Sequence, residues 1–341
     1  MRRGTCGFDV DELRSGLFEE PATEKPPALP VDSYWDWQDR DNVIPNRVTD
    51  LLPNEALPLN SSAAPAPGRV AEQDQGRQDT EAHTGCLIIN ADDWGVNQET
   101  TDRIIDCVQR GTISAVSAMV FMDDSARAAE TALQLGVDAG LHLNLSTQFT
   151  SPACPTLLKE HLGKIASCLL RHPLSRVLYY PGLARSFEYV VASEFDEFCR
   201  LYGGNPERID GHHHLHLCAN VQRARLLPAG TLVRRNFSFL PGEKSLVNRL
   251  YRKAVDRRLA RRHRVVDFLY NLAPLQSKDR LQRIFSSARN SVVEVETHPI
   301  NPEEHRFLTS GEMLHQLGDL AISPNFAAHF AAPHAGLATS R

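Results

Sequence analysis

From residue 85 onward, short apolar runs alternate with longer stretches in which apolar residues recur every three or four positions. The short runs are rich in β-branched residues and predict buried strands, whereas the longer stretches predict helices. We expect strands at 86–91, 116–122, 139–145, 209–217, 232–236, 265–269 and 292–296, helices at 98–110, 125–135, 246–263 and 311–320, and a long, partly helical region at 157–201. Strands that alternate with helices favour a single α/β domain built on a parallel sheet.

The two ends of the chain lack this pattern. Residues 1–84 hold nine of the 21 prolines, and their 16 acidic and 8 basic residues give a net charge of −8. Such a segment buries too little apolar surface to offset its ordering entropy, so we expect a disordered, acidic, proline-rich extension. Residues 323–341 show little periodicity and are expected to form a loose tail. The folded domain is therefore expected at 85–322.

Composition excludes several classes of protein. The formal charge of −5 is mild and does not favour a nucleic-acid partner. The seven cysteines are odd in number, widely spaced and without a C-x-x-C pair, which favours a reducing, cytoplasmic compartment. The chain has no run of about 18 apolar residues, so we expect no membrane span.

The first expected strand ends in two adjacent carboxylates, Asp92 and Asp93. Two neighbouring carboxylates in an apolar site need a cation or a shared proton. The pair therefore predicts either a bound metal or separate acid and base roles at a strand end. The alternative is structural, because aspartate commonly caps the helix that follows.

Histidines stand at three further strand positions. His142 alternates with leucines, so its imidazole faces the side opposite to them. On a strand, His212, His214 and His216 would share one face, where imidazoles suit Zn²⁺ or another divalent ion. Periodicity does not choose among these three. His298 follows the last strand, just before a proline. The alternatives are a hydrogen-bonded core histidine at 142, a surface cluster at 212–216 and an ordinary loop residue at 298.

Together these residues suit hydrolysis. One carboxylate and two imidazoles can hold a divalent ion and leave positions open for water and substrate. Such an ion lowers the pKa of its water and polarises a carbonyl oxygen. The second aspartate would then serve as base and His298 as acid. The arrangement is typical of amide and ester hydrolysis.

Four motifs, in this order and spacing, resemble the YdjC-like carbohydrate deacetylases. They are Asn90-Ala91-Asp92-Asp93-Trp94-Gly95, Gly140-Leu141-His142-Leu143, Asp210-Gly211-His212-His213-His214-Leu215-His216 and His298-Pro299. The resemblance covers about residues 85–320. It implies an irregular, TIM-type (β/α)-barrel-like fold and a hydrolase that cleaves a linear amide. The implied substrate is an N-acetylated sugar, either an oligosaccharide or a lipid-linked sugar.

The resemblance also implies roles for single residues. Asp93, His142 and His212 match the metal ligands, Asp92 matches the general base, and His298 matches the acid. The implied ion is Mg²⁺, with Zn²⁺ or another divalent ion as alternatives. Trp94 stands where phenylalanine is usual, which we interpret as a mild change on an apolar wall.

Two other functions fit the same residues: a different metal-dependent hydrolase, such as a phosphoesterase, and a non-catalytic scaffold that retains the fold. The segment 244–264 adds a separate feature, with nine basic residues and only Asp256 as an acid. Such a segment is either the solvated face of a core helix or a contact to a membrane or a lipid-linked substrate. The sequence leaves a homodimer open.

Overall fold

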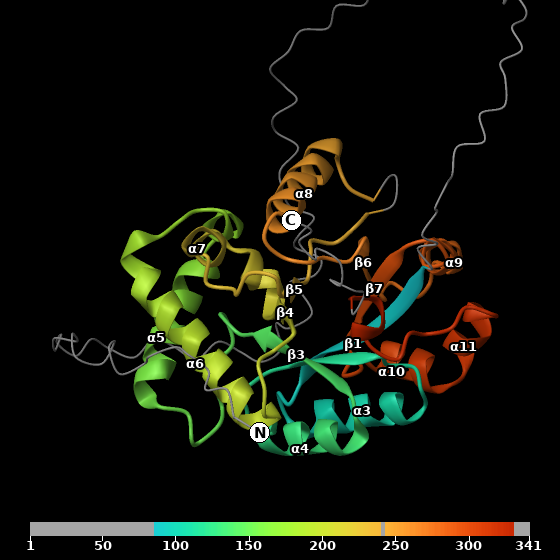
Figure 1. The fold of residues 1–341 in the computed structure, drawn as a ribbon, viewed down its shortest axis with the longest axis horizontal. Helices are drawn as coiled ribbons and strands as arrows, with labels where there is room; N and C mark the ends of the chain where they lie inside the picture. The colour runs from blue at the N-terminus through green and yellow to red at the C-terminus, as the bar shows by residue number, and fades with distance from the viewer. Residues whose placement is uncertain (1–84, 240–242, 331–341) are drawn as a thin grey trace, which may run out of the picture. The chain divides into compact units, whose positions relative to one another are not determined.

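The computed structural model describes residues 85–239 and 243–330, which contain a seven-stranded parallel sheet (Figure 1). The strands are β1 (Cys86–Trp94), β2 (Ala115–Ala118), β3 (Asp138–Leu143), β4 (Arg208–Gly211), β5 (Leu232–Val233), β6 (Phe268–Asn271) and β7 (Val292–Thr297). Their order in the sheet is β5-β4-β3-β2-β1-β7-β6, and every pair is parallel. The sheet curls into an open half-barrel, so the expected (β/α)-barrel-like fold is confirmed. The predicted extension 1–84 lies outside the described residues.

Helices connect the strands and cover the sheet. They are α3 (Gln98–Gln109), α4 (Ser125–Leu135), α5 (Thr156–Leu169), α6 (Ala184–Tyr202), α7 (Ala219–Ala224), α8 (Leu246–Leu259), α9 (Lys278–Ser287), α10 (Pro302–Thr309), α11 (Glu312–Leu317) and α12 (Ala327–Phe330), with short 3₁₀ turns η3 (Pro173–Arg176), η4 (Pro181–Leu183) and η5 (His212–Leu217). Within residues 85–239 and 243–330, none is long and apolar enough to cross a bilayer. The Asn97 side chain caps α3 by accepting the Thr100 backbone N–H at 2.9 Å.

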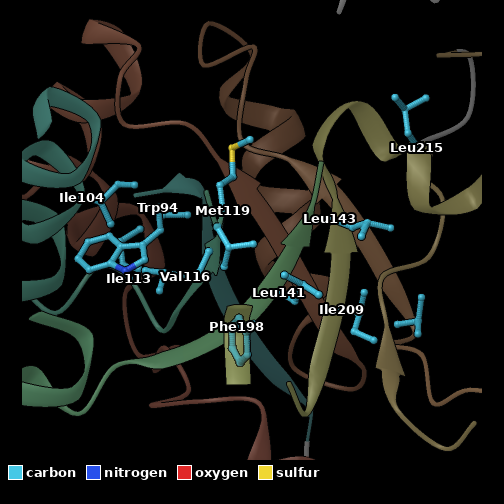
Figure 2. Close-up of a cluster of buried hydrophobic side chains, with 14 of the residues drawn as sticks. Trp94, Ile104, Ile113, Val116, Met119, Leu141, Leu143, Phe198, Ile209 and Leu215 are labelled. Atoms are coloured by element: carbon cyan, nitrogen blue, oxygen red, sulfur yellow. The ribbon is translucent and has the colours of Figure 1, made fainter. Parts of the chain in front are cut away.

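Strand β1 is the centre of the core. All nine of its residues are buried, because both faces of a parallel sheet are covered. Trp94 ends this strand and lies in the main apolar cluster with Ile104 and Met119 (Figure 2). Its indole N–H donates to the backbone oxygen of Ala128 at 3.2 Å. Trp94 is therefore a buried residue of the apolar core.

Several expected elements differ in the structure. The strands predicted at 116–122 and 232–236 are shorter, and the one predicted at 265–269 covers Phe268–Asn271. The predicted strand 209–217 stops at Gly211, because the next residues turn into η5. The predicted helix 311–320 appears as the shorter α11, which follows Gly311, whose φ of 85° lies in the left-handed region; α10, which precedes it, was not predicted. The described part of the predicted tail is packed: Phe326 is buried, and the guanidinium of Arg208 lies over its ring.

Candidate metal centre and its charged surroundings

The predicted site residues meet at the carboxyl-terminal edge of the sheet. Asp92 and Asp93 lie at the end of β1, His142 on β3, His212 directly after β4 and His298 directly after β7. Neighbouring parallel strands present their carboxyl ends at the same edge, so residues far apart in the sequence converge there. The order of the strands, and not their spacing in the sequence, brings these five side chains together.

A backbone irregularity turns both aspartates toward this site. In a regular strand, Asp92 and Asp93 would face opposite sides of the sheet. The pairing of β1 with β2 is irregular between Ala91 and Trp94, and Asp93 has a φ of 65°. Bulges of this kind re-aim side chains next to functional sites. As a result, Asp92 Oδ2 and Asp93 Oδ1 lie 3.8 Å and 3.4 Å from the same atom, His142 Nε2.

Asp93, His142 and His212 have the geometry of a divalent-ion site. Asp93 Oδ1 lies 2.9 Å from His212 Nδ1, and one ligand atom from each of the three residues lies within 4.8 Å of the others. Metal–ligand bonds of about 2.1 Å place neighbouring ligand atoms roughly 3.0 Å apart in an octahedron and roughly 3.4 Å apart in a tetrahedron. The separations of 2.9 Å and 3.4 Å around Asp93 Oδ1 fit these values.

Charge reinforces this arrangement. Burial alone would raise the pKa of Asp93, but His212 and His142 outweigh it and hold the pKa well below its usual range. Burial would likewise lower the pKa of His142, but Asp92 and Asp210 raise it well above its ordinary value. Asp93 is therefore held as an anion, the form in which a carboxylate binds a metal ion.

Asp210 orients the imidazole of His142. His142 Nδ1 lies 2.8 Å from Asp210 Oδ1, which leaves Nε2 directed at Asp93. Metal-binding histidines usually donate their other ring nitrogen to a carboxylate in this way. Asp210 in turn accepts hydrogen bonds from Ser117 and from Arg208, the latter at 3.1 Å. Burial would raise the pKa of Asp210, but Arg234 and His142 hold it far below its usual range.

Arg234, which sequence reasoning missed, is the central cation of the site. Its guanidinium is buried and forms two hydrogen bonds with Asp92, at 2.6 Å and 2.8 Å. It also contacts Asp210 at 3.0 Å, Glu294 at 2.8 Å and Glu296 at 3.0 Å. One guanidinium thus faces four carboxylates, an arrangement that suits the forked geometry of arginine.

A local signal for this network does exist in the sequence. Glu294 and Glu296 alternate with valines on β7, so both carboxylates face one side of a buried strand. Buried carboxylates need a cation. Arg234, which directly follows the apolar pair of β5, is a candidate for that cation. What the sequence does not show is that β5 lies across the barrel from β7.

The histidine cluster does not share one face, contrary to our prediction. His213 and His214 have φ values of 57° and 56°, so the chain turns instead of continuing the strand. His214 Nε2 lies 3.3 Å from Glu296, and the His216 ring donates to the backbone oxygen of Arg234 at 2.9 Å. Burial lowers the pKa of His216 to about 3, which keeps its ring neutral. Of the three alternate histidines, His212 is the one next to Asp93.

His298 lies at the rim of the site. Its Nε2 is 4.0 Å from Glu296, and its backbone N–H donates to Glu304 at 2.8 Å. Its side chain is 14% exposed, whereas those of Asp92 and Asp93 are almost fully buried. Burial would lower the pKa of His298, but Glu296 and Asp92 raise it above its ordinary value. The ring is thus accessible and is protonated more readily than a free histidine.

Two other sets of residues in the described part of the chain could be read as ion sites. They are Asp92, His142 and Asp210, and Asp92, Glu296 and His298. Both sets include Asp92, which Arg234 already binds, and Arg234 also contacts Asp210 and Glu296. A metal ion bound there would be repelled by the Arg234 guanidinium. The set of Asp93, His142 and His212 therefore fits an ion best.

Comparison with known proteins gives the family. A model of the YdjC-like protein family matches residues 86–322, which is well over half of the chain. The chain belongs to the YdjC-like family. The resemblance inferred from the four sequence motifs is confirmed, and the matched range contains every residue of the site described above.

Individual relatives of this YdjC-like chain are more distant. The chitooligosaccharide deacetylase of Serratia marcescens is 32% identical over 132 residues, which cover 38% of this chain and 50% of that protein. A chitooligosaccharide deacetylase of Yersinia pestis (strain Pestoides F) is 29% identical over 136 residues, 40% of this chain and 52% of that protein. The matched segments thus span about half the length of these relatives.

A solved structure shares the YdjC-like fold. It is the crystal structure of a protein of Enterococcus faecalis V583 to which cellobiose-phosphate cleavage has been ascribed. The TM-score is 0.50 at 18% sequence identity, and the match covers 72% of this chain and 98% of that chain. At this level of identity the likeness concerns the fold alone.

Proposed function

We propose that this YdjC-like chain is a metal-dependent hydrolase that removes the acetyl group from an N-acetylated sugar. The convergence of Asp93, His142 and His212 within 4.8 Å, with Asp92 beside them, is the observation that carries the proposal. The names of the Serratia and Yersinia relatives support the choice of an acetylated sugar as substrate.

The residues divide into holding and proton-transfer roles. Asp93, His142 and His212 would hold a divalent ion, which supplies an acidified water and polarises the amide carbonyl. Asp92 accepts the proton of the attacking water, and Arg234 fixes the orientation of its carboxylate through two hydrogen bonds. His298 donates a proton to the sugar nitrogen as the carbon–nitrogen bond breaks. The products are acetate and the free amine.

The charge of the site supports an uncharged substrate. Five carboxylates gather there, from Asp92, Asp93, Asp210, Glu294 and Glu296, against the two guanidinium groups of Arg208 and Arg234. Both guanidinium groups are already bound to carboxylates, which makes them poor ligands for a phosphate. With a divalent ion bound, these carboxylates still outnumber the positive charges of the ion and the two guanidinium groups, which favours a neutral acetamide over a phosphate ester.

The donor set bears on the identity of the ion. Mg²⁺, which the family resemblance implies, usually takes oxygen ligands, whereas two imidazoles and one carboxylate are typical of Zn²⁺ and other transition metals. We therefore propose that Zn²⁺ binds this site more tightly than Mg²⁺. A cytoplasmic location is part of the proposal, and the buried free thiols of Cys86, Cys107, Cys154 and Cys218 support it.

The deciding experiment measures acetate and phosphate release by the full-length protein. A panel of N-acetylated mono- and oligosaccharides and their phosphorylated counterparts is incubated with the protein, with and without added Zn²⁺ or Mg²⁺. We expect acetate from at least one acetylated sugar, only when a divalent ion is present. Asp319→Asn is the matched control for the substitutions of Asp92 and Asp93 described below, because this carboxylate is 79% exposed and distant in sequence from the site. Phosphate release without acetate, or metal-independent turnover, would overturn the proposal.

A further inference from the structure

Helix α8 packs on the domain by its polar side. Asp256, which is buried, accepts hydrogen bonds from Arg235 at 2.8 Å and from the Asn236 side chain at 2.9 Å. Leu259 is the one buried apolar side chain among the described residues of this helix. The contact to the domain is thus an ion pair and its hydrogen bonds, next to a single leucine. An amphipathic helix on a protein surface normally packs in the opposite sense.

The apolar residues of α8 face outward. Leu246, Val247, Leu250 and Tyr251 are 68%, 78%, 57% and 51% exposed. Positions four apart are neighbours on a helix, so Leu246 and Leu250 lie next to each other, as do Val247 and Tyr251. The four side chains form one patch over the first two turns. Contiguous exposed apolar side chains of this kind are typical of a surface that binds a protein, a membrane or a ligand.

Cations border this apolar patch. Arg249, Lys253 and Arg257 are exposed and follow one another at four-residue spacing, so they form a row along one edge of it. Arg258 and Arg261 continue the exposed charge beyond the patch. The whole segment 244–264 holds nine basic residues against Asp256, which itself is paired with Arg235.

From this juxtaposition we infer that α8 docks on an anionic lipid surface. An apolar face rimmed by lysine and arginine matches the boundary between anionic headgroups and acyl chains. A second copy of the chain is a poorer occupant, because two copies of the same basic helix would bring like charges together. A nucleic acid is poorer still, because its phosphates would meet the apolar centre of the patch.

The position of α8 places the proposed lipid contact near the candidate metal centre. Arg235, which holds Asp256, directly follows Arg234 of the candidate metal centre. Helix α8 is therefore tied to the strand end that carries the site, and lies in the upper part of Figure 1. The lipid contact itself does not depend on the proposed reaction.

Co-sedimentation with vesicles tests the inference on the full-length protein. We expect binding to vesicles of equal parts phosphatidylcholine and phosphatidylglycerol, little binding to phosphatidylcholine alone, and weakening with added salt. Leu246→Ser combined with Leu250→Ser should weaken binding at least tenfold. Lys253→Gln combined with Arg257→Gln should weaken it about 25-fold, since each cation near an anionic surface contributes about fivefold.

Leu133→Ser is the matched control, because Leu133 is 60% exposed on α4 and has no such border of cations. This variant should bind vesicles like the unmodified protein, and all variants should release acetate from soluble sugars at the unmodified rate. If the proposed function is wrong, neither the unmodified protein nor any variant will release acetate, but the result of the vesicle experiment will still stand. Equal binding to neutral vesicles, or none to anionic ones, would overturn the inference. So would a dimer in sedimentation equilibrium that Leu250→Ser dissociates.

Discussion

The candidate metal centre and helix α8 use the same residue types in opposite ways. Around Arg234, charges are buried and each lies within hydrogen-bond distance of an opposite charge. On α8, most cations are exposed, and they adjoin exposed leucine, valine and tyrosine side chains. Removing one member of a buried pair leaves an uncompensated charge, whereas removing an exposed cation leaves water in its place. Burial, more than charge itself, decides how much each arginine matters to the fold.

The largest expected effect is at the proposed metal ligand Asp93. Asp93→Asn removes the anion that His142 and His212 share, and asparagine tolerates the φ of 65° at this position. We expect loss of bound metal and a fall in the deacetylation rate beyond the roughly 10⁴-fold typical of losing one acid or base. Metal analysis of the purified variant, with His212→Ala beside it, checks this. Full metal content in both would refute the ligand assignment.

Asp92→Asn should separate proton transfer from metal binding. The variant keeps the shape of the side chain and one oxygen that can accept from Arg234, but its amide nitrogen cannot accept, so it loses one of the two hydrogen bonds and the basic carboxylate. We expect full metal content with kcat lowered by roughly 10²–10⁴-fold. Steady-state kinetics and metal analysis on one preparation would show whether the variant loses kcat while it keeps its metal. An unchanged kcat would remove Asp92 from the mechanism.

Arg234→Met directly contrasts the two regions. Four carboxylates lose their shared cation, so the free energy of unfolding should fall by about 3–5 kcal/mol. Arg257→Met on α8 is the matched change at an exposed position and should stay within about 0.5 kcal/mol. Urea denaturation of both variants measures the difference. Similar losses in the two would mean that burial does not separate these arginines.

A smaller effect is expected at Asp210, which contacts the proposed metal ligand His142. Asp210→Asn leaves His142 in place but weakens the contact that orients its ring. We expect metal affinity to fall by about 10–100-fold, the range for such supporting partners. Titration of the metal-free variant with Zn²⁺ gives the value. Unchanged affinity would show that the strand alone orients His142.

The smallest effect is a shift in pH dependence. Glu296 raises the pKa of His298, and the protonated ring is the proposed acid. Activity should therefore be lost as pH rises through this raised pKa, above the usual value for histidine. Glu296→Gln removes the neighbouring anion and should move this alkaline limb to lower pH. A limb that stays in place in kcat/KM profiles would assign the titration to another group.

Local pattern was enough to predict the fold class and the family. Apolar runs identified most strands, and polar residues at the ends of those runs predicted which strand ends carry chemistry. Asp92, Asp93, His142 and His298 could be selected because each stands in or directly after an apolar strand in the sequence. Their metal and proton-transfer roles stay predictions, which the variants above test.

The tertiary structure decided what depends on distant contacts. The irregularity at Asp93 turns two consecutive carboxylates to one side, and the left-handed turn at His213 and His214 separates three histidines that a strand would align. Arg234 meets Asp92 across 142 positions of sequence. The outward apolar face of α8 follows from the pairing of Asp256 with Arg235, which fixes the side on which the helix packs.

The sequence by itself determined the period of each element and the residue types at its ends, because both are properties of neighbouring positions. Which charges neutralise one another depends on strand order and on burial. These arise only when distant segments exclude water together, so only the folded chain could decide them.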